Sequence, residues 1–419
     1  MLSVIIRRPL AAAFLLVALL VPFSAGAQTQ ADLFDDTSLR DIQLTVSQRD
    51  WDALRAEADE NTYYTADLRW NGLTVRNIGI RSRGAGTRNG IKPGLRLDFN
   101  RYLANQEFLG LKALVLDNAY TDPSTVRELL AMKLYNRLGL SASREAHVRL
   151  FINGEYAGLY IAVEPVDRTF INRVFGADES NVERGGFLFE YKWKREWGLE
   201  YLGNDLAPYA GLFEPKSRET DAASVLYGPI EEMIREINDS PPERLQADVG
   251  SLLDLDEFVR YLAMQNAVAE IDGLVGNWGL SNFYLYRFRD GRPAQFLPWD
   301  ADHAFWDPNL PIDERLDTDV LAAKLMELPS SRRRYLRTLI DTSQTIASQA
   351  TDDDPRGWLE REVDRLEALI APAAAADTFS PFSFEEFTGN MNDLRALLRS
   401  RPPAVADQAA AALAALDTP

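Results

Sequence analysis

The sequence of 419 residues contains no cysteine and only two histidines, His147 and His303. The absence of cysteine excludes disulfide bonds, zinc–thiolate sites and a cysteine nucleophile. Two histidines are too few for a three-histidine metal centre, and serine–histidine catalysis would depend on one of these two. Metal chemistry with oxygen ligands stays open, because the chain has 63 Asp and Glu residues.

Positive charge is also scarce, since 45 Lys and Arg residues leave a net charge of −18. Phosphate backbones need a basic face on the protein, so we expect no nucleic-acid partner. Hydrophobic residues make up 46% and aromatic residues 10% of the chain. That composition is sufficient for a packed core and excludes wholesale disorder.

Long apolar runs are absent except near the N-terminus, where the segment Leu10–Phe23 is shorter than the ~20 residues of a membrane span. Arg7 and Arg8 precede this run, and Ala25-Gly26-Ala27 follows it as a small-residue cleavage site. Residues 1–27 are therefore predicted to be a secretory signal peptide that is cleaved after Ala27, with an uncleaved anchor as the alternative. We expect a protein that is secreted, periplasmic or on the cell surface, without a stable membrane anchor after cleavage.

The segment 28–165 has mostly the two-residue hydrophobic alternation of β-strands. The predicted strands are 41–46, 73–83, 95–99, 113–116 and a hairpin of 147–152 and 156–163 around Asn153-Gly154. Ser47 is predicted to cap a short helix that ends near Ala58. A second helix is predicted to start at Asp122-Pro123 and to end at Gly139.

The segment 166–419 is predicted to be mainly helical. The predicted helices include 167–175, closed by Gly176, 222–237, 255–269 and most of the chain to about Ala414. The predicted strands are 187–193 and a hairpin of 282–287 and 293–297. The chain thus divides into a β-rich first part and a helix-rich second part.

A glycine-rich segment, Arg81–Lys92, lies between two predicted strands. Arg81 and Arg83 share one strand face, and Gly84, Gly86 and Gly90 allow close approach of the backbone to a ligand. Backbone N–H groups with cationic side chains can hold a phosphate. The segment does not match the Walker A pattern and does not open a helix, and a flexible surface hairpin is the alternative.

A second group of polar residues lies between Glu270 and Asp307. Asp272 follows a predicted helix, Asn282 begins a strand, and Asp300 and Asp302 follow the next strand. Such hard oxygen ligands suit Mg²⁺ or Mn²⁺. The alternative is that these residues serve as turn and cap residues.

Several of these pieces together resemble the CotH kinase family, a group of secreted or surface proteins with an atypical protein-kinase-like fold. The matching pieces are Arg81-Ser82-Arg83-Gly84, residues 92–97, Asp122-Pro123-Ser124, residues 152–160 with Glu164, residues 272–286, and Pro298-Trp299-Asp300-Ala301-Asp302. They cover roughly half of the chain. The resemblance implies an α+β, two-lobed fold with a β-rich N-lobe (28–165) and a mainly helical C-lobe (166–419).

The resemblance also implies metal-dependent transfer of the ATP γ-phosphate to Ser or Thr hydroxyls of a protein substrate. Asp272 is the implied base or hydroxyl orienter. Asn282 and Asp300 are the implied ligands of Mg²⁺ or Mn²⁺, and Asp302 is predicted to share the metal. The acceptor protein is not identified by the sequence.

Lys92 is the implied phosphate-contacting lysine, helped by Arg81 or Arg83. Glu128 is predicted to orient this lysine, as the Lys–Glu pair of kinases does. Lys192 and Lys216 are competing candidates for the phosphate role.

The chain departs from standard kinases in its catalytic segment. Asp272 and Asn282 are ten residues apart rather than five, no His-Arg-Asp triplet precedes Asp272, and position 270 is Glu where many relatives have Asn. His303 is interpreted as a loop histidine that supports the Asp cluster, and His147 as structural. Two alternatives stay open: a secreted metal-dependent hydrolase that uses Asp272, Asp300 and Asp302 as metal ligands, and a non-catalytic envelope or matrix binding protein.

Overall fold

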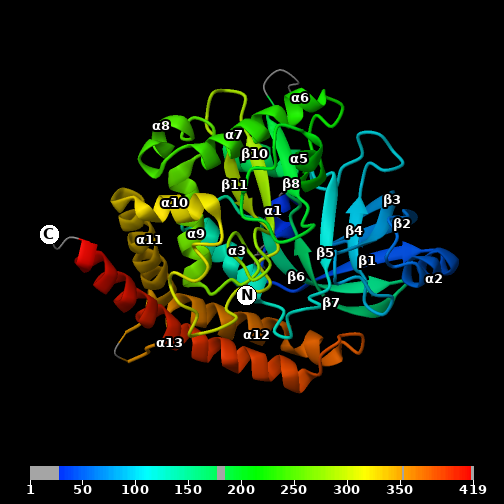
Figure 1. Ribbon diagram of the computed structural model, residues 1–419. Coiled ribbons are helices and arrows are strands. Elements are labelled where there is room, and N and C mark those ends of the chain that lie inside the picture. The colour runs from blue at the N-terminus through cyan, green and yellow to red at the C-terminus, as the bar shows by residue number, and fades with distance from the viewer. Residues whose placement is uncertain (1–27, 177–184, 352, 417–419) are drawn as a thin grey trace, which may run out of the picture.

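The computed structural model describes residues 28–176, 185–351 and 353–416. The predicted signal peptide lies outside these residues. Figure 1 shows the strands of the first part gathered on one side, with the helices of the second part beside and beneath them. The predicted α+β organisation, with a β-rich N-terminal region and a helical C-terminal region, is therefore confirmed.

The N-terminal region is built around a closed barrel with the strand order β1-β2-β3-β4-β5-β7-β6. Its strands are β1 (Arg40–Val46), β2 (Tyr64–Trp70), β3 (Leu73–Arg83), β4 (Gly94–Asp98), β5 (Ala113–Asp117), β6 (Glu145–Ile152) and β7 (Glu155–Val163). The parallel pairing of β1 with β6 closes the barrel, and the other neighbours are antiparallel. The predicted hairpin of β6 and β7 turns at Asn153 and Gly154, which both have positive φ.

Side chains of alternating residues fill the barrel. In β1, the side chains of Ile42, Leu44 and Val46 are buried and those between them are exposed. This two-residue period is the pattern from which the strand was predicted. Trp70 packs edge-on against Phe108 at one end of the same core.

A second sheet lies in the helical region and has the order β11-β10-β8-β9. Its strands are β8 (Phe187–Tyr191), β9 (Phe213–Pro215), β10 (Phe283–Arg287) and β11 (Gln295–Pro298). The hairpin of β10 and β11 forms as predicted, and β8 ends two residues earlier than predicted. This hairpin carries Asn282 at its start and Asp300 just beyond its end.

Helices make up about half of the rest of the described chain. They are α1 (Gln30–Leu33), α2 (Gln48–Ala56), α3 (Arg127–Arg137), α4 (Arg168–Phe175), α5 (Ala207–Leu212), α6 (Ala223–Leu226), α7 (Gly228–Asp239), α8 (Leu245–Asp248), α9 (Leu255–Ala267), α10 (Val320–Glu327), α11 (Pro329–Ala347), α12 (Trp358–Ala376) and α13 (Phe384–Leu416). A short 3₁₀ turn spans Pro242–Arg244. No helix in the described part of the chain combines the length and the apolar character that a membrane span requires.

Two predicted helix boundaries are wrong. The helix expected from Asp122 begins only at Arg127, because Thr125 has a φ of 61° that no α-helix contains. Asp122 instead accepts hydrogen bonds from the backbone N–H groups of Ser124 and Arg127. The single helix expected over 222–237 is split into α6 and α7, since Pro229 lies in the first turn of α7 and cannot continue a preceding helix.

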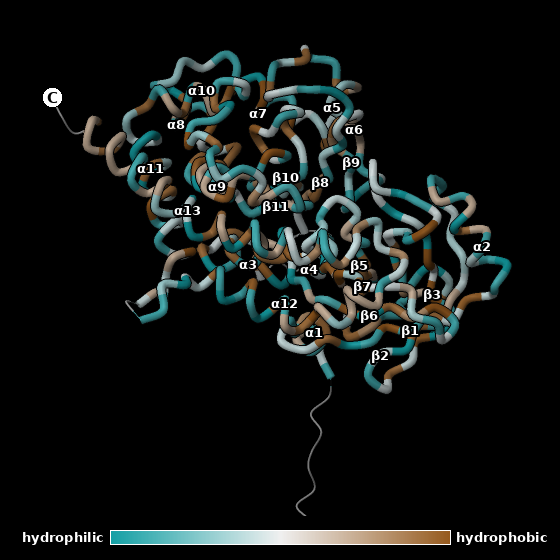
Figure 2. Tube along the Cα trace, turned by 90° about the horizontal axis from the view of Figure 1, so that it is seen from below, coloured by the Kyte–Doolittle hydropathy of each residue, from teal (hydrophilic) through white to brown (hydrophobic). Residues whose placement is uncertain are grey.

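A separate hydrophobic cluster packs between the barrel and the second sheet. Val115 of β5 and Val163 of β7 pack in it with Phe170 of α4, Tyr284 of β10 and Trp299. Figure 2 shows the hydrophilic segments mostly at the outer turns of the chain, with the hydrophobic segments between the elements. The polar residues that follow β3, β5 and β11 lie along this junction.

Candidate functional site

Asp272 and Asn282 are in direct contact, although ten residues separate them. The side-chain amide of Asn282 donates to the Asp272 carboxylate at 2.9 Å and to the Asp272 carbonyl at 3.0 Å. The Ser281 hydroxyl donates to the other carboxylate oxygen of Asp272 at 2.5 Å. Asn282 has a φ of 53°, which turns the chain into β10 while its amide stays on Asp272. The Asn282 amide oxygen, at the other end of this group, is the atom that can bind a cation.

Asp300 and Asp302 follow β11 on a sharp turn, in which Asp300 has a φ of 54°. Asp302 is held by two neighbours: the Thr121 hydroxyl donates to one of its oxygens, and the His303 ring contacts the other at 3.0 Å. This contact with Asp302 raises the pKa of His303 to about 9, so the ring is a cation at neutral pH. The histidine therefore supports the Asp cluster.

Carboxylates from three parts of the chain repel one another at this point. Desolvation, followed by the charge of Asp302, raises the pKa of Asp300 to about 8, and Asp117 and Asp272 add to the effect. Desolvation also raises the pKa of Asp117, which ends β5. Carboxylates that raise one another's pKa in this way are typical of functional sites.

Arg83, at the end of β3, is a cation that faces Asp117 and Asp300 of this cluster. Its guanidinium lies 3.6 Å from Asp117 and 5.3 Å from the centre of the Trp299 ring. Desolvation opposes its charge, but Asp300 and Asp117 hold its pKa above the ordinary value. Arg83 thus joins the end of β3 to the loop that carries Asp300.

Glu128 of α3 and Glu145 of β6 lie beside the same cluster. Both side chains are buried. Burial raises the pKa of each well above its ordinary value, and the charges of Asp117 and Asp300 add to this. Burial and neighbouring carboxylates therefore favour the protonated form of both side chains, and a nearby cation would oppose this.

Lys92 does not form the predicted pair with Glu128. Its ammonium group lies 2.8 Å from Asp377, just beyond α12, and 5.1 Å from the centre of the Tyr160 ring. Burial lowers the pKa of Lys92, and Asp377 opposes this shift. The pair was expected by analogy with kinases, whereas here a residue from the far C-terminal region binds the lysine. A phosphate role for Lys92 stays a prediction.

Arg81, the other arginine predicted to help bind phosphate, contacts residues outside the Asp cluster. It donates to the Asn61 side chain at 3.0 Å and lies 5.6 Å from the centre of the Tyr63 ring, at the side of the barrel. In the glycine-rich segment, the Arg88 guanidinium donates to the Gly84 carbonyl at 2.8 Å. A Cβ atom at Gly90 would lie 2.4 Å from the Arg55 carbonyl oxygen, so this glycine is required for packing against α2.

The two competing lysines belong to a separate ion-pair network. Lys192 contacts Glu190 at 2.7 Å and Glu214 at 3.0 Å, and Lys216 contacts the same two glutamates at 2.6 and 2.8 Å. The two glutamates lie on the paired strands β8 and β9. Both lysines are therefore paired with glutamates of the second sheet.

The prediction from sequence missed three residues of the site, Asp117, Thr121 and Glu145, and noted Glu270 only as a departure from relatives. Asp117 directly follows the apolar strand residues 113–116, a position that often carries a functional polar group, and this was the one usable signal. Burial raises the pKa of Glu270 to about 8, and its backbone contact with Asp272 opposes the shift. One Glu270 oxygen accepts the Asp272 N–H at 2.8 Å, and the other has no hydrogen-bond partner.

The donor set fits a divalent cation that is shared with a phosphate. Within the described residues, no three side chains of Asp, Glu or His lie close enough together to enclose a metal ion on their own. Mg²⁺ is commonly held by one or two carboxylates with substrate phosphates and water as the remaining ligands. Asp300, Asp302 and the Asn282 amide oxygen can supply the protein share of such a shell.

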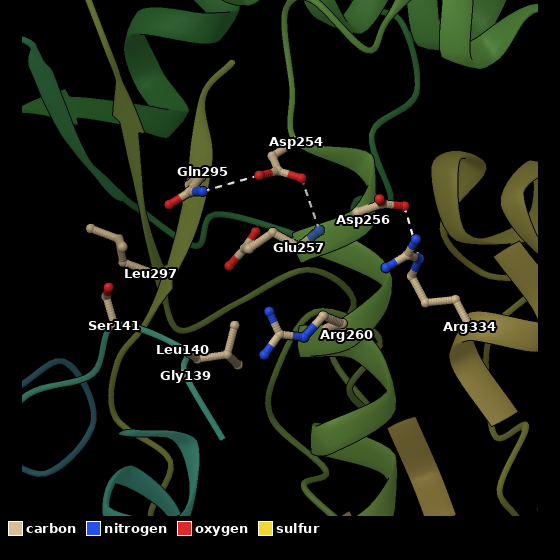
Figure 3. Close-up of a pocket in the computed structure, with 10 residues that line it drawn as sticks. All are labelled: Gly139, Leu140, Ser141, Asp254, Asp256, Glu257, Arg260, Gln295, Leu297 and Arg334. Carbon is tan, nitrogen blue, oxygen red and sulfur yellow. Dashed lines mark hydrogen bonds and ion pairs between the residues drawn. The ribbon is translucent and has the colours of Figure 1, made fainter. Parts of the chain in front are cut away.

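The hollow in Figure 3 lies apart from this cluster, at the N-terminal end of α9. It has a volume of about 170 Å³, and its walls include Asp254, Glu257, Arg260 and Gln295. Asp272 follows the other end of α9, whose 13 residues span roughly 20 Å. The hollow therefore adds no side chain to the site.

Residues 80–405 match the family model described as CotH kinase protein. Among curated proteins, the chain is similar to the inner spore coat protein H of Bacillus subtilis (strain 168). The two are 24% identical over 366 residues, which cover 82% of this chain and 90% of the relative.

Solved structures of kinases are similar at a lower level. The Helicobacter pylori proinflammatory kinase CtkA matches with a TM-score of 0.31 and 11% identity, over 76% of this chain and 94% of that one. The Golgi casein kinase matches with a TM-score of 0.30 and 10% identity, over 90% of this chain and 77% of that one. The same kinase with Mn/ADP bound also gives a TM-score of 0.30.

Proposed function

The chain belongs to the CotH kinase family, and from this membership and the geometry of the site we propose that it is a metal-dependent protein kinase. The proposed reaction transfers the γ-phosphate of ATP to a Ser or Thr hydroxyl of a protein substrate. The observation that supports it most is the contact of Asp272 with Asn282, next to a cluster of repelling carboxylates that Arg83 faces.

Asp272 is the proposed base. The Ser281 hydroxyl and the Asn282 amide fix its carboxylate in place, and a carboxylate held in this way can accept the proton of an acceptor hydroxyl. In the balanced step, the acceptor oxygen forms a bond to the γ-phosphorus and the bond from this phosphorus to the β–γ bridging oxygen breaks. ADP leaves with the electron pair of that bond, and the acceptor proton passes to Asp272.

The remaining residues bind and orient the reactants. We propose that Asp300, Asp302 and Asn282 hold Mg²⁺ or Mn²⁺, and that Arg83 contacts a phosphate oxygen. The bound metal would neutralise charge on the phosphates. Glu128 and Glu145 lie beside this cluster, and a bound cation would favour their ionised forms.

We further propose that residues 1–27 export the protein. The arginine pair, the apolar run and the small-residue cleavage site support this proposal. The relative in Bacillus subtilis is by name a spore coat protein, which supports a surface location.

The test is transfer from γ-labelled ATP by the mature chain with Mg²⁺ or Mn²⁺, with and without a generic protein acceptor. Asp300→Ala should abolish transfer. Asp290→Ala is the matched control, because Asp290 lies in the exposed turn of the same β10–β11 hairpin and pairs with neighbouring Arg292.

Equal transfer by the wild type and Asp300→Ala, or no transfer by the wild type, would remove the kinase proposal. Thermal stabilisation by ATP and metal without transfer would favour the non-catalytic binding protein, because a ligand that binds only the folded state raises the unfolding midpoint. Release of free phosphate without transfer would favour the hydrolase.

A further inference from the structure

Arg401 is a buried arginine in the C-terminal helix α13, with a relative exposure of 2%. Its guanidinium contacts no carboxylate at hydrogen-bond distance among the described residues. All of its recorded hydrogen bonds go to backbone carbonyl oxygens. Removing a charged guanidinium from water costs free energy, even when backbone carbonyls bind it. The chain segments that supply these carbonyls therefore indicate the role of Arg401.

The first group of partners is the C-terminal end of α9. The Arg401 Nε–H donates to the Ala267 carbonyl at 2.9 Å, and one Nη group donates to the Asn266 carbonyl. The Asn266 carbonyl also accepts the Ala269 N–H at 3.2 Å, and both carbonyls lie at the negative end of the helix dipole, which a guanidinium stabilises. Asp272 follows this helix end by five residues.

The second group is the loop that follows Asp302. The other Nη group of Arg401 donates to the carbonyls of Leu310 at 2.7 Å, Pro308 at 3.1 Å and Asp307 at 3.4 Å. In Figure 1, α13 runs beneath these yellow-coloured loops. One planar group thus links the segment that leads to Asp272 with the loop that follows Asp302.

Backbone pairs bring the same two segments together. The N–H of Phe305 donates to the Val268 carbonyl at 2.6 Å, and the N–H of Trp306 donates to the Ala269 carbonyl at 3.3 Å. On the opposite side of the loop, Arg127 donates to the carbonyls of Ala304 and Phe305. The loop is therefore fixed from α3, from α9 and from α13.

We propose that Arg401 is a positioning residue, which sets the distance between the base Asp272 and the metal-binding pair Asp300 and Asp302. The proposal rests on the proposed kinase function. Arg401 acts through the backbone and touches no reacting atom. Arginine is required because its five N–H groups point in fixed, divergent directions, whereas lysine donates from a single nitrogen.

The matched comparison uses Arg401→Met, Arg401→Lys and Arg399→Met in the full mature chain. Arg399 lies in the same helix, is largely exposed, and binds Glu360 rather than the loop. Two readouts are taken: hydrogen exchange of peptides that cover 266–272 and 300–310, and kcat and the half-saturating metal concentration for transfer from ATP.

For Arg401→Met we expect faster exchange in both peptides and a 10- to 100-fold loss in kcat or in metal affinity, the range seen when groups that support metal ligands are removed. Arg401→Lys should recover part of both losses. Arg399→Met should leave exchange in these peptides and the kinetic values close to wild type. If Arg401→Met does not fold, Arg401→Lys is compared with Arg399→Met by the same two readouts.

Wild-type exchange in 266–272 and 300–310 for both Arg401 variants would overturn the proposal. So would kinetic losses no larger than those of Arg399→Met. The exchange readout needs no activity, so a wild type without transfer would remove the kinase function while the role of Arg401 in holding the two segments is still decided.

Discussion

The ammonium group of Lys92 lies 2.8 Å from the carboxylate of Asp377, and both side chains are buried. This pair joins the glycine-rich segment of the barrel to the turn that follows α12. Gly158 makes the contact feasible, because a Cβ at this position would lie 2.7 Å from an Asp377 oxygen. The Asp377 carboxylate also accepts the Leu159 N–H at 2.9 Å, which fixes it against β7.

Removing one partner of this pair should lower the free energy of unfolding. Asp377→Asn or Lys92→Met leaves the other charge buried without its counter-charge, which costs about 3 to 5 kcal/mol. The double variant should be less destabilised than the sum of the two, as measured by urea denaturation in a double-mutant cycle.

The exposed pair of Asp290 and Arg292 is the control for this cycle, and its coupling energy should not exceed about 1 kcal/mol. If Lys92→Met abolishes phosphate transfer while its stability equals that of wild type, then Lys92 contacts the phosphate, and the structural role of the pair is excluded.

Asp300→Asn should stabilise the metal-free protein at neutral and alkaline pH. The pKa of Asp300 is about 8 in the folded state and 3.8 ordinarily, so its favourable contribution is complete below pH 3.8 and is lost as the pH rises through 8. The amide carries no charge and escapes this loss. Thermal unfolding in a chelator should therefore show a gap between variant and wild type that widens from pH 4 to pH 9.

Asp290→Asn, in the exposed hairpin turn, should show no such widening. With metal and ATP the order should reverse, because only the wild-type carboxylate binds the cation. A constant difference at every pH would contradict the repulsion described for Asp300.

Arg83→Gln should raise the KM for ATP about tenfold or more, since it removes the cation that faces Asp117 and Asp300. Arg81→Gln is the control on the same strand, and it should leave KM within about twofold because Arg81 is bound to Asn61. Steady-state kinetics at saturating metal separates the two. The same rise for both variants would show that the glycine-rich segment as a whole binds phosphate.

The two histidines should affect stability at opposite ends of the pH range. Burial lowers the pKa of His147 to about 4, so its contribution is complete above pH 6.5 and is lost as the pH falls to 4, with a limit of about 3 kcal/mol. The contact with Asp302 raises the pKa of His303 to about 9, so its contribution is complete below pH 6.5 and is lost as the pH rises through 9.

Urea denaturation from pH 4 to pH 9.5 tests both directions in one series. His147→Gln should lose less stability than wild type between pH 6.5 and 4. His303→Gln should lose less between pH 6.5 and 9. Parallel curves for either variant would show that the histidine concerned keeps the same protonation state folded and unfolded.

The sequence predicted local structure correctly where residues close together in the chain determine it. The Asn153-Gly154 turn, the Ser47 cap, the alternation in β1 and the closure of α4 by Gly176 all formed as predicted. In each case residues within a few positions determine the backbone conformation. The predicted start of α3 failed because Thr125 takes up a positive φ that the Asp122-Pro123 pattern does not reveal.

The same contrast between local and long-range information applies to the residues of the site. Asp272, Asn282 and Asp300 were named as site residues from motifs within about thirty residues of chain. The resemblance to a known family supplied their roles. The partners of cations could not be expected, since any of 63 acidic side chains can reach a lysine or an arginine once the chain is folded.

Sequence alone thus determined the acidic, cysteine-free composition, the two-part organisation and the residues on which oxygen-ligand chemistry is predicted to depend. Tertiary structure alone decided that Arg83 faces the carboxylates and Lys92 binds Asp377, and that Arg401 holds the ends of two distant segments. The physical reason is that composition and turn preferences are local properties of the chain. Charge pairing, burial and the resulting pKa shifts arise only when the barrel, the second sheet and α13 close around the same site.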